Sequence, residues 1–184
     1  MPDLLQDLPF HEELKDLSGN EYYEKSKEVT ATKFTFKFKE DLKFENGEPI
    51  NAETLKYTLK RRIDPNCKNK QAEYIYIYDE KYLELKNAKK YYEQKSETKV
   101  DFEEVGVKAV QGDPLTFELY FDQPKNLFKV VNSLNMVILV PPKSYDAAFQ
   151  NDAQTQSSYG TVNFPFQSYG PYVVKEWSNN QKFF

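Results

Sequence analysis

The sequence of 184 residues contains very little cysteine or histidine. Cys67 is the only cysteine, so no disulfide can form within the chain, and His11 is the only histidine, which excludes a metal site built from several histidines. A cysteine–histidine catalytic pair would have to join Cys67, in a polar loop, to His11 in the N-terminal stretch. We therefore expect a loop thiol and a surface imidazole, with no catalytic residue, no metal site and no cofactor.

Long apolar runs and blocks of one charge are also missing. No run of about 18 apolar residues is present, so no transmembrane helix is expected. Residues 1–7 lack the basic start, apolar stretch and small-residue cleavage site of a secretion signal. The 25 Lys and Arg residues are interspersed with 29 Asp and Glu residues, for a net charge of −4. This mixture speaks against nucleic-acid binding, which needs a basic stripe, and the run Lys60, Arg61 and Arg62 is expected to be a solvated helix face.

Aromatic residues are abundant by contrast. The chain has 14 Phe, 14 Tyr and one Trp, which together make 16% of its residues. Tyrosine combines a large apolar ring with a polar tip and suits surfaces that bind amphipathic ligands. We expect the phenylalanines to form a β core, and the length is sufficient for one domain around one such core.

Three segments have the alternation of half-buried strands. Residues 32–39 place three phenylalanines at alternate positions, with Lys and Thr between them. Residues 105–109 and 116–121 also alternate and are separated by a turn signal at 111–114. They predict a β-hairpin whose apolar side packs on the phenylalanine side of the first strand.

Helical spacing appears in several places. Asn51 is a favourable N-cap, Glu53 lies in the first turn, and apolar residues follow at intervals of four until Asp64 and Pro65 end the pattern. This predicts a helix over 51–64. Composition and spacing predict further helices over 80–95, 126–135 and 143–149.

Residues 74–78 alternate tyrosine with isoleucine. As a strand, this segment turns Tyr74, Tyr76 and Tyr78 to one side and the isoleucines to the other. As a helix, the same five residues would be distributed around most of its circumference. A tyrosine face therefore depends on the strand interpretation.

Glu103 and Glu104 are the carboxylate pair that deserves a test as a catalytic acid and base. Adjacent residues on a strand point to opposite faces, so they would not flank one substrate. We expect an ordinary soluble charge pair, and the protein is expected not to be an enzyme.

The C-terminal residues 169–177 predict a turn followed by a strand, with Trp177 in a packing role. The chain then stops at Phe183 and Phe184 without a polar tail. We expect that the natural protein continues beyond this point.

Several short segments, in this order and at these intervals, carry a resemblance to a known family. They are Phe34–Phe44, Asn46–Glu53, Leu59–Arg61 with Asp64–Pro65, Glu104–Val110, and Gly170–Tyr172 with Lys175–Trp177. The set resembles the peptide-binding branch of the solute receptors that serve ABC importers, the oligopeptide, dipeptide and nickel-binding family.

The resemblance implies an α/β fold: an α+β subdomain with a mixed β-sheet and flanking helices, part of a two-lobed receptor like the periplasmic binding proteins. It divides the chain into a lead-in from the main lobe (1–31), the smaller subdomain of the first lobe (32–168) and a strand returning to the main lobe (169–184). It also implies an extracytoplasmic location, a lipid anchor on the parent protein, a peptide ligand and membrane permease subunits as partners.

For the site, the resemblance implies that Tyr74 corresponds to a tyrosine that looks into the ligand cleft, with Tyr76 and Tyr78 nearby. The chain departs from the family at Tyr169–Tyr172, where a polar residue usually precedes Gly, so a ligand role for that polar position is in doubt. The family's charged anchors for peptide termini lie mostly in the other lobe, outside this chain.

Two interpretations from other classes remain open. A carbohydrate-binding module on a β-sandwich could use tyrosine rings as sugar platforms, but it predicts almost no helix. A surface lipoprotein domain used for adhesion would have no transport role.

Overall fold

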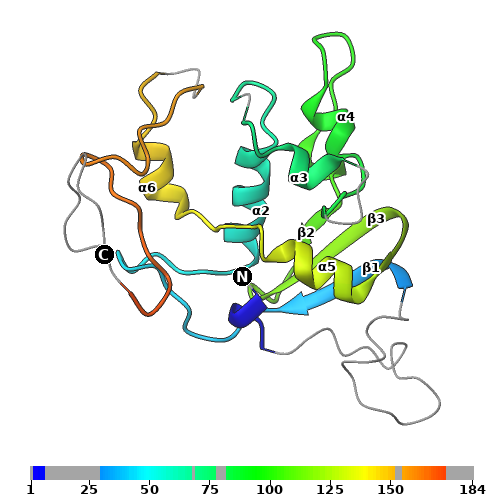
Figure 1. The fold of residues 1–184 in the computed structure, drawn as a ribbon, viewed down its shortest axis with the longest axis horizontal. Helices are drawn as coiled ribbons and strands as arrows, with labels where there is room; N and C mark the ends of the chain where they lie inside the picture. The colour runs from blue at the N-terminus through cyan, green and yellow to red at the C-terminus, as the bar shows by residue number, and fades with distance from the viewer. Residues whose placement is uncertain (1, 7–29, 68, 78–81, 152–154, 173–184) are drawn as a thin grey trace.

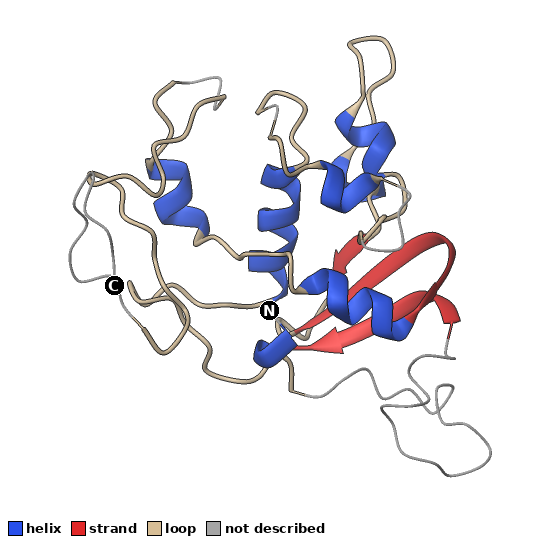
Figure 2. Ribbon diagram, viewed as in Figure 1, coloured by secondary structure: helices blue, strands red, loops and turns tan. Residues whose placement is uncertain are grey.

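The computed structural model describes residues 2–6, 30–67, 69–77, 82–151 and 155–172. In chain order, the elements are η1 (Pro2–Leu4), β1 (Thr30–Lys37), α2 (Ala52–Arg62), α3 (Glu73–Tyr76), α4 (Ala88–Tyr92), η3 (Phe102–Glu104), β2 (Val107–Ala109), β3 (Thr116–Asn126), α5 (Leu127–Leu134) and α6 (Pro142–Ala147). Strands gather on one side of the molecule, and the opposite side consists of long loops around α6 (Figure 2). Within the described residues, no helix is long and apolar enough to cross a membrane.

The three strands form one antiparallel sheet in the order β1-β3-β2. Its buried face is aromatic, as the alternation predicts: Phe34, Phe36, Phe38 and Phe117 are at most 1% exposed. Phe36 pairs with Phe117 across β1 and β3, and their rings stack with centroids 5.4 Å apart. The predicted hairpin and its packing on the first strand are confirmed.

Helix α2 begins where its cap residue predicts. The Asn51 side chain accepts a hydrogen bond from the Thr54 backbone at 3.0 Å, and the Thr54 hydroxyl accepts one from the Asn51 backbone at 3.3 Å. Leu55, Leu59 and Ile63 are fully buried. This helix stands at the centre of the molecule and packs against β2 on one side and α6 on another (Figure 1).

Two further predicted helices are confirmed as shorter elements. Asn126 caps α5 by accepting a hydrogen bond from the Phe128 backbone at 2.9 Å. Val130 and Leu134 are buried and form the inner side of α5. The helix lies across β1 and β3 (Figure 1). Helix α6 starts at a proline in the first turn, the position where a missing backbone donor costs least.

Of the two interpretations of residues 74–78, the strand is wrong. Residues 73–76 form the short helix α3, and Ile75 is fully buried while Tyr74 and Tyr76 are partly exposed. The chain then returns alongside this helix: the Leu83 backbone donates to the Tyr74 carbonyl and the Leu85 backbone to the Ile75 carbonyl, both at 2.9 Å. Backbone hydrogen bonds from residues 83 and 85 therefore contribute to the local structure of residues 73–76.

The predicted helix over 80–95 is wrong for most of its length. Of the described residues 82–95, only 88–92 are helical, as α4. Glu84 and Asn87 have φ angles of 51° and 56°, in the left-handed region that interrupts a right-handed helix. Residues 78–81 lie outside the described residues.

The segment carrying Glu103 and Glu104 is the turn of 3-10 helix η3, not a strand. Glu103 pairs with Lys56 at 2.7 Å, and Glu104 accepts a backbone hydrogen bond from Asp101. These contacts agree with the expected role of Glu103 and Glu104 as an ordinary charge pair. The two residues do not lie on a strand, however, as the argument from the sequence assumed. The lead-in also contributes to the core, since Leu5 is only 5% exposed.

Candidate functional site

The two described tyrosines of the predicted site lie in different aromatic clusters. The ring of Tyr74 meets Tyr82 edge to face at 4.9 Å, and the ring of Tyr76 stacks on Tyr92 at 4.8 Å. Because α3 is helical, positions two apart point in different directions. The single tyrosine face, which depends on the strand interpretation, does not form between Tyr74 and Tyr76, and Tyr78 lies outside the described residues.

Arg62 is a residue that sequence reasoning misplaced. It was expected on a solvated face with Lys60 and Arg61, but it is only 7% exposed, whereas Lys60 is exposed. Its guanidinium donates a 2.7 Å hydrogen bond to the Met136 carbonyl. Helical spacing was the signal that could have found it, since Arg62 follows the buried Leu59 by three positions.

Tyrosines from three separate segments interact with the charge of Arg62. They are Tyr74 of α3, Tyr145 of α6 and Tyr169 of the C-terminal loop. Burial lowers the pKa of the guanidinium, and the phenols partly oppose that shift. Among the described residues, no carboxylate forms an ion pair with Arg62.

Two groups of aromatic contacts lie across α2, α6 and the C-terminal loop. Tyr145 lies between Tyr57, Phe149 and Tyr159, with ring centroids 6.3, 5.4 and 5.3 Å away. Tyr169 packs edge to face on Phe44 at 5.6 Å, and its hydroxyl accepts from the Leu139 backbone. These rings hold the irregular side of the molecule against α2.

Arg61, beside Arg62, has a different role. It donates to the Asp146 carboxylate at 2.7 Å and to the Tyr57 hydroxyl at 3.1 Å, and its guanidinium lies 4.8 Å from the ring centroid of Phe149. The Tyr57 hydroxyl also donates to Asp146, at 2.5 Å. Burial and this hydrogen bond raise the pKa of Tyr57 well above its usual range. Arg61 therefore fastens α6 to α2.

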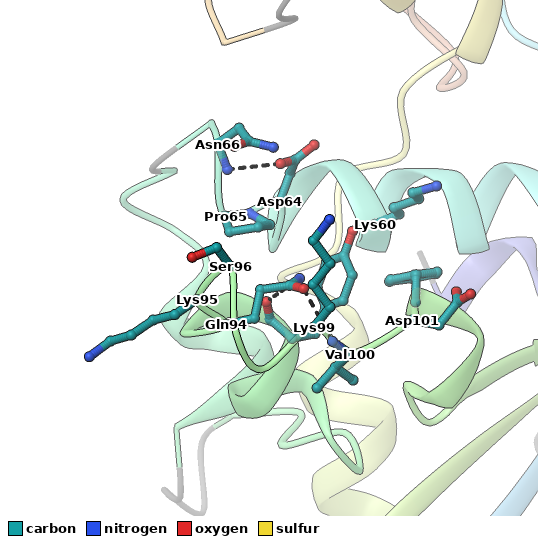
Figure 3. A pocket seen from close by; sticks show the side chains of 12 residues that line it. Lys60, Asp64, Pro65, Asn66, Gln94, Lys95, Ser96, Lys99, Val100 and Asp101 are labelled. Carbon is teal, nitrogen blue, oxygen red and sulfur yellow. Dashed lines mark hydrogen bonds between the residues drawn. The ribbon is translucent and has the colours of Figure 1, made fainter.

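A pocket of about 640 Å³ lies between the end of α2 and the loop that follows α4 (Figure 3). Lys60, Asp64 and Asn66 line one side, and Lys99 and Asp101 line the other. The Asp64 side chain accepts from the Asn66 backbone, and Gln94 bridges Tyr91 and Val100 (Figure 3). Its charges are of both signs, and the predicted tyrosines are not part of it.

A smaller pocket of about 300 Å³ lies between the start of α2 and the start of α6. Glu48 accepts hydrogen bonds from the backbones of Lys143 and Ser144 at its edge. Burial opposes ionisation of Glu48, but hydrogen bonds from the Ser144 hydroxyl, the Asn46 amide and the two backbones outweigh it, so the pKa of the carboxyl is lowered. No group of three or more metal-ligating side chains occurs in the described part of the chain, and Cys67 is a half-buried loop residue.

The family model for bacterial extracellular solute-binding proteins, family 5, matches residues 21–183. This match includes β1, the hairpin and all the helices from α2 to α6. The chain belongs to this family.

Solved structures similar to this family 5 chain share its fold. The substrate-binding domain of an oligopeptide ABC transporter from Bacillus anthracis is 24% identical, with a TM-score of 0.63 over 85% of this chain and 27% of that one. The unliganded open form of the periplasmic murein tripeptide binding protein MppA is 21% identical, with a TM-score of 0.60 over 83% and 26%. OppA of Listeria monocytogenes, solved with bound peptide, is 24% identical, with a TM-score of 0.56 over 79% and 25%.

The family 5 chain spans about a quarter of the length of these solved structures. A search of curated proteins found none that matches. The expected fold class is confirmed: an α/β arrangement with a sheet and flanking helices, of the kind found in the two-lobed family 5 receptors. A helix-free β-sandwich, which the carbohydrate-binding interpretation requires, is not this fold.

Proposed function

We propose that this chain is part of the first lobe of an extracytoplasmic receptor that captures peptides and delivers them to the membrane permease of an ABC importer. The observation that carries the proposal is the family 5 match over residues 21–183. The shared fold with structures described as oligopeptide-binding and murein tripeptide binding proteins supports it. In this proposal, residues 1–31 lead in from the main lobe, 32–168 form its smaller subdomain and 169–184 return to it.

A peptide receptor must hold the backbone of its ligand while tolerating many side chains. Pairing the extended peptide as an added strand satisfies its N–H and C=O groups, and roomy hydrated pockets accommodate the side chains. Closure of the two lobes then buries the ligand and links occupancy to the shape that the permease recognises. This chain would provide one wall of such a cleft.

Tyr74 is the proposed ligand contact on this wall, with Tyr76 and Tyr78 as further candidates. The Tyr74 ring is partly exposed and is supported from the side by Tyr82, so it offers a fixed apolar surface with a hydroxyl at its tip. The Tyr74 phenol also interacts electrostatically with the buried guanidinium of Arg62. No step of chemistry is assigned to the chain, and the proposed function needs neither enzyme activity nor a cofactor.

Mass spectrometry of the small molecules that co-purify with the full-length receptor tests the proposed function. We expect peptides, released on denaturation in an amount close to that of the protein. Recovery of oligosaccharides or of no ligand, together with no binding of a peptide mixture, would contradict it. Genes for importer subunits beside the receptor gene would count against the adhesive alternative.

Replacing Tyr74 with alanine tests the proposed contact. In the full-length receptor, Tyr74→Ala should weaken binding of a co-purifying peptide about tenfold, because the buried ring contact is lost. Isothermal titration calorimetry measures this directly. Tyr120→Ala, on the polar face of the sheet, is the matched control; equal affinities for both variants would remove Tyr74 from the site.

A further inference from the structure

The larger pocket, between the end of α2 and the loop after α4, does not include the tyrosines of the proposed peptide contact. Neither Tyr74 nor Tyr76 lines it. Its volume of about 640 Å³ lies within the range of small-molecule sites, roughly 300 to 1,000 Å³. Its lining comes from two chain segments that the fold brings together (Figure 3). The charges of this lining indicate which ligand it would favour.

The two carboxylates that line the pocket already have partners in the protein. Asp64 lies 3.6 Å from the Arg61 guanidinium and accepts a hydrogen bond from the Asn66 backbone at 2.9 Å. Asp101 caps η3 by accepting a hydrogen bond from the Glu103 backbone, also at 2.9 Å. Both carboxylates therefore stabilise the walls of the pocket.

The lysines of the lining have no such partners. Lys60, Lys95 and Lys99 form no ion pair with any residue that the structure describes. The Lys60 ammonium lies 5.9 Å from the ring centroid of Phe102, which is also part of the lining. Lys99 extends toward α2, whereas Lys95 points away from the pocket (Figure 3). Lys60 and Lys99 therefore place positive charge without an ion-pair partner on two sides of the pocket.

A largely buried phenol adds a hydrogen-bond donor to the same lining. Tyr91 is only 8% exposed, and its ring packs edge to face on Phe102 at 5.2 Å. In the described part of the chain, its hydroxyl has no hydrogen-bond partner. Burial raises the pKa of this phenol, so it stays protonated at neutral pH and can donate. Since a hydroxyl in a buried side chain needs a partner, water or a ligand in the pocket must supply it.

We propose that this pocket binds a small dianion, with Lys60 and Lys99 pairing with its charges and the Tyr91 hydroxyl donating to one of its oxygens. Two chemistries supply such a ligand, a dicarboxylate and a phosphate group. Both present oxygens that accept hydrogen bonds from ammonium and hydroxyl groups. The inference goes beyond the proposed peptide capture, because it concerns a second site with a different lining.

Calorimetry on the full-length receptor, saturated with a co-purifying peptide, tests this site apart from the peptide cleft. The probes are succinate, inorganic phosphate and glycine, a zwitterion without net charge. We expect one of the two dianions to bind with a dissociation constant below about 1 mM at low salt, at least about tenfold tighter than glycine. Binding should weaken as ionic strength rises. The preferred dianion identifies the chemistry of the ligand.

The variants separate the pocket from the general charge of the protein. Lys60→Met combined with Lys99→Met should weaken binding of the preferred dianion about tenfold or more. Lys89→Met combined with Lys90→Met removes the same charge from exposed positions of α4 outside the lining, and should change the affinity by less than about twofold. Tyr91→Phe keeps the ring and should weaken binding about three- to tenfold, while thermal unfolding stays unchanged because the hydroxyl has no protein partner among the described residues.

Weaker binding in the pocket variants alone supports the proposed site. An equal loss in the α4 pair, or unchanged affinity in folded pocket variants, would overturn it. Binding of glycine as tightly as the preferred dianion, or no binding of either dianion up to about 10 mM, would overturn it as well. Failure of the receptor to bind any peptide rejects the proposed function instead, and the same titrations without peptide then still test this pocket.

Discussion

Gly106 lies where three chain segments share their backbone hydrogen bonds. Its N–H donates to the Lys86 carbonyl, the Lys86 N–H donates to the Tyr120 carbonyl, and the Tyr120 N–H donates back to the Gly106 carbonyl, all within 2.8 to 2.9 Å. A Cβ atom at this position would lie 2.2 Å from the Tyr120 carbonyl oxygen and 2.9 Å from the Lys86 nitrogen. The close approach of backbones is therefore what requires glycine here.

Gly106→Ala should lower the free energy of unfolding by about 1 to 3 kcal/mol, because the backbone of β3 must shift to admit the methyl group. Urea denaturation of the chain measures the change. Gly170→Ala is the control, since the nearest atom to its added Cβ is 4.0 Å away, and it should change stability by less than about 0.5 kcal/mol. Equal stability of the two variants would show that the strand pair adjusts without cost.

Residue types alone could not separate Lys60, Arg61 and Arg62. All three are long cations that usually remain in water. In the fold, Lys60 is exposed, Arg61 is largely buried and forms ion pairs, and Arg62 is buried. Their position relative to Leu55 and Leu59 carries the missing information, because a helix repeats its buried face every three to four residues. What no spacing could reveal is the identity of the neighbours, since Tyr145 and Tyr169 come from more than 80 residues further along the chain.

At the scale of single elements, the start of α2 depends on Asn51. Asn51→Ala should reduce the free energy of unfolding by about 1 kcal/mol, because the Thr54 N–H loses its acceptor. Chemical denaturation monitored by circular dichroism at 222 nm is the measurement. Asn51→Asp keeps an acceptor and adds a favourable charge at the helix N-terminus, so it should retain the stability of the parent; a loss as large as that of alanine would refute the capping account.

The contact between α2 and α6 should weaken in alkali. The folded state raises the pKa of Tyr57 through burial and through its hydrogen bond to Asp146. The stabilisation is complete below the unfolded-state pKa of tyrosine, about 10, and is lost as pH rises toward the folded-state value. Denaturation between pH 8 and about 11 should therefore show a decline that is shallower in Tyr57→Phe.

Asp146→Asn refines that test. It removes the charged acceptor but leaves Tyr57 buried, so the alkaline decline should lie between those of the parent and Tyr57→Phe. An identical alkaline slope in all three proteins would show that Tyr57 does not carry the effect.

Elements whose pattern reflects a single packing surface were predictable. Strand β1 and helix α2 each have one buried side, and the spacing of their apolar residues in the sequence matches the repeat of a strand and of a helix. Residues 74–95 were not predictable in the same way. Leu83 bonds back to Tyr74 within the segment and Lys86 bonds to Tyr120 of β3, so these pairings override the local helical preference.

At the scale of the whole molecule, the chain has a well-packed side and an irregular one. The sheet, α2 and α5 enclose the phenylalanine core, while the loops around α6 are held by aromatic contacts such as Tyr145 with Tyr159 (Figure 2). The order of short segments along the chain was sufficient to indicate the family, and the match over residues 21–183 confirms it. Tyr74 could be named from the resemblance as a ligand contact, and that role stays a prediction, whereas the burial of Arg62 was not expected.

Titration of the isolated chain and of the full-length receptor with the same co-purifying peptide tests the central claim most directly. If the chain is one wall of a cleft that a second lobe must close, it should bind alone with a dissociation constant on the order of millimolar or weaker, far above that of the intact receptor. A constant of about micromolar for the isolated chain would contradict the account, because the chain would then hold a complete site.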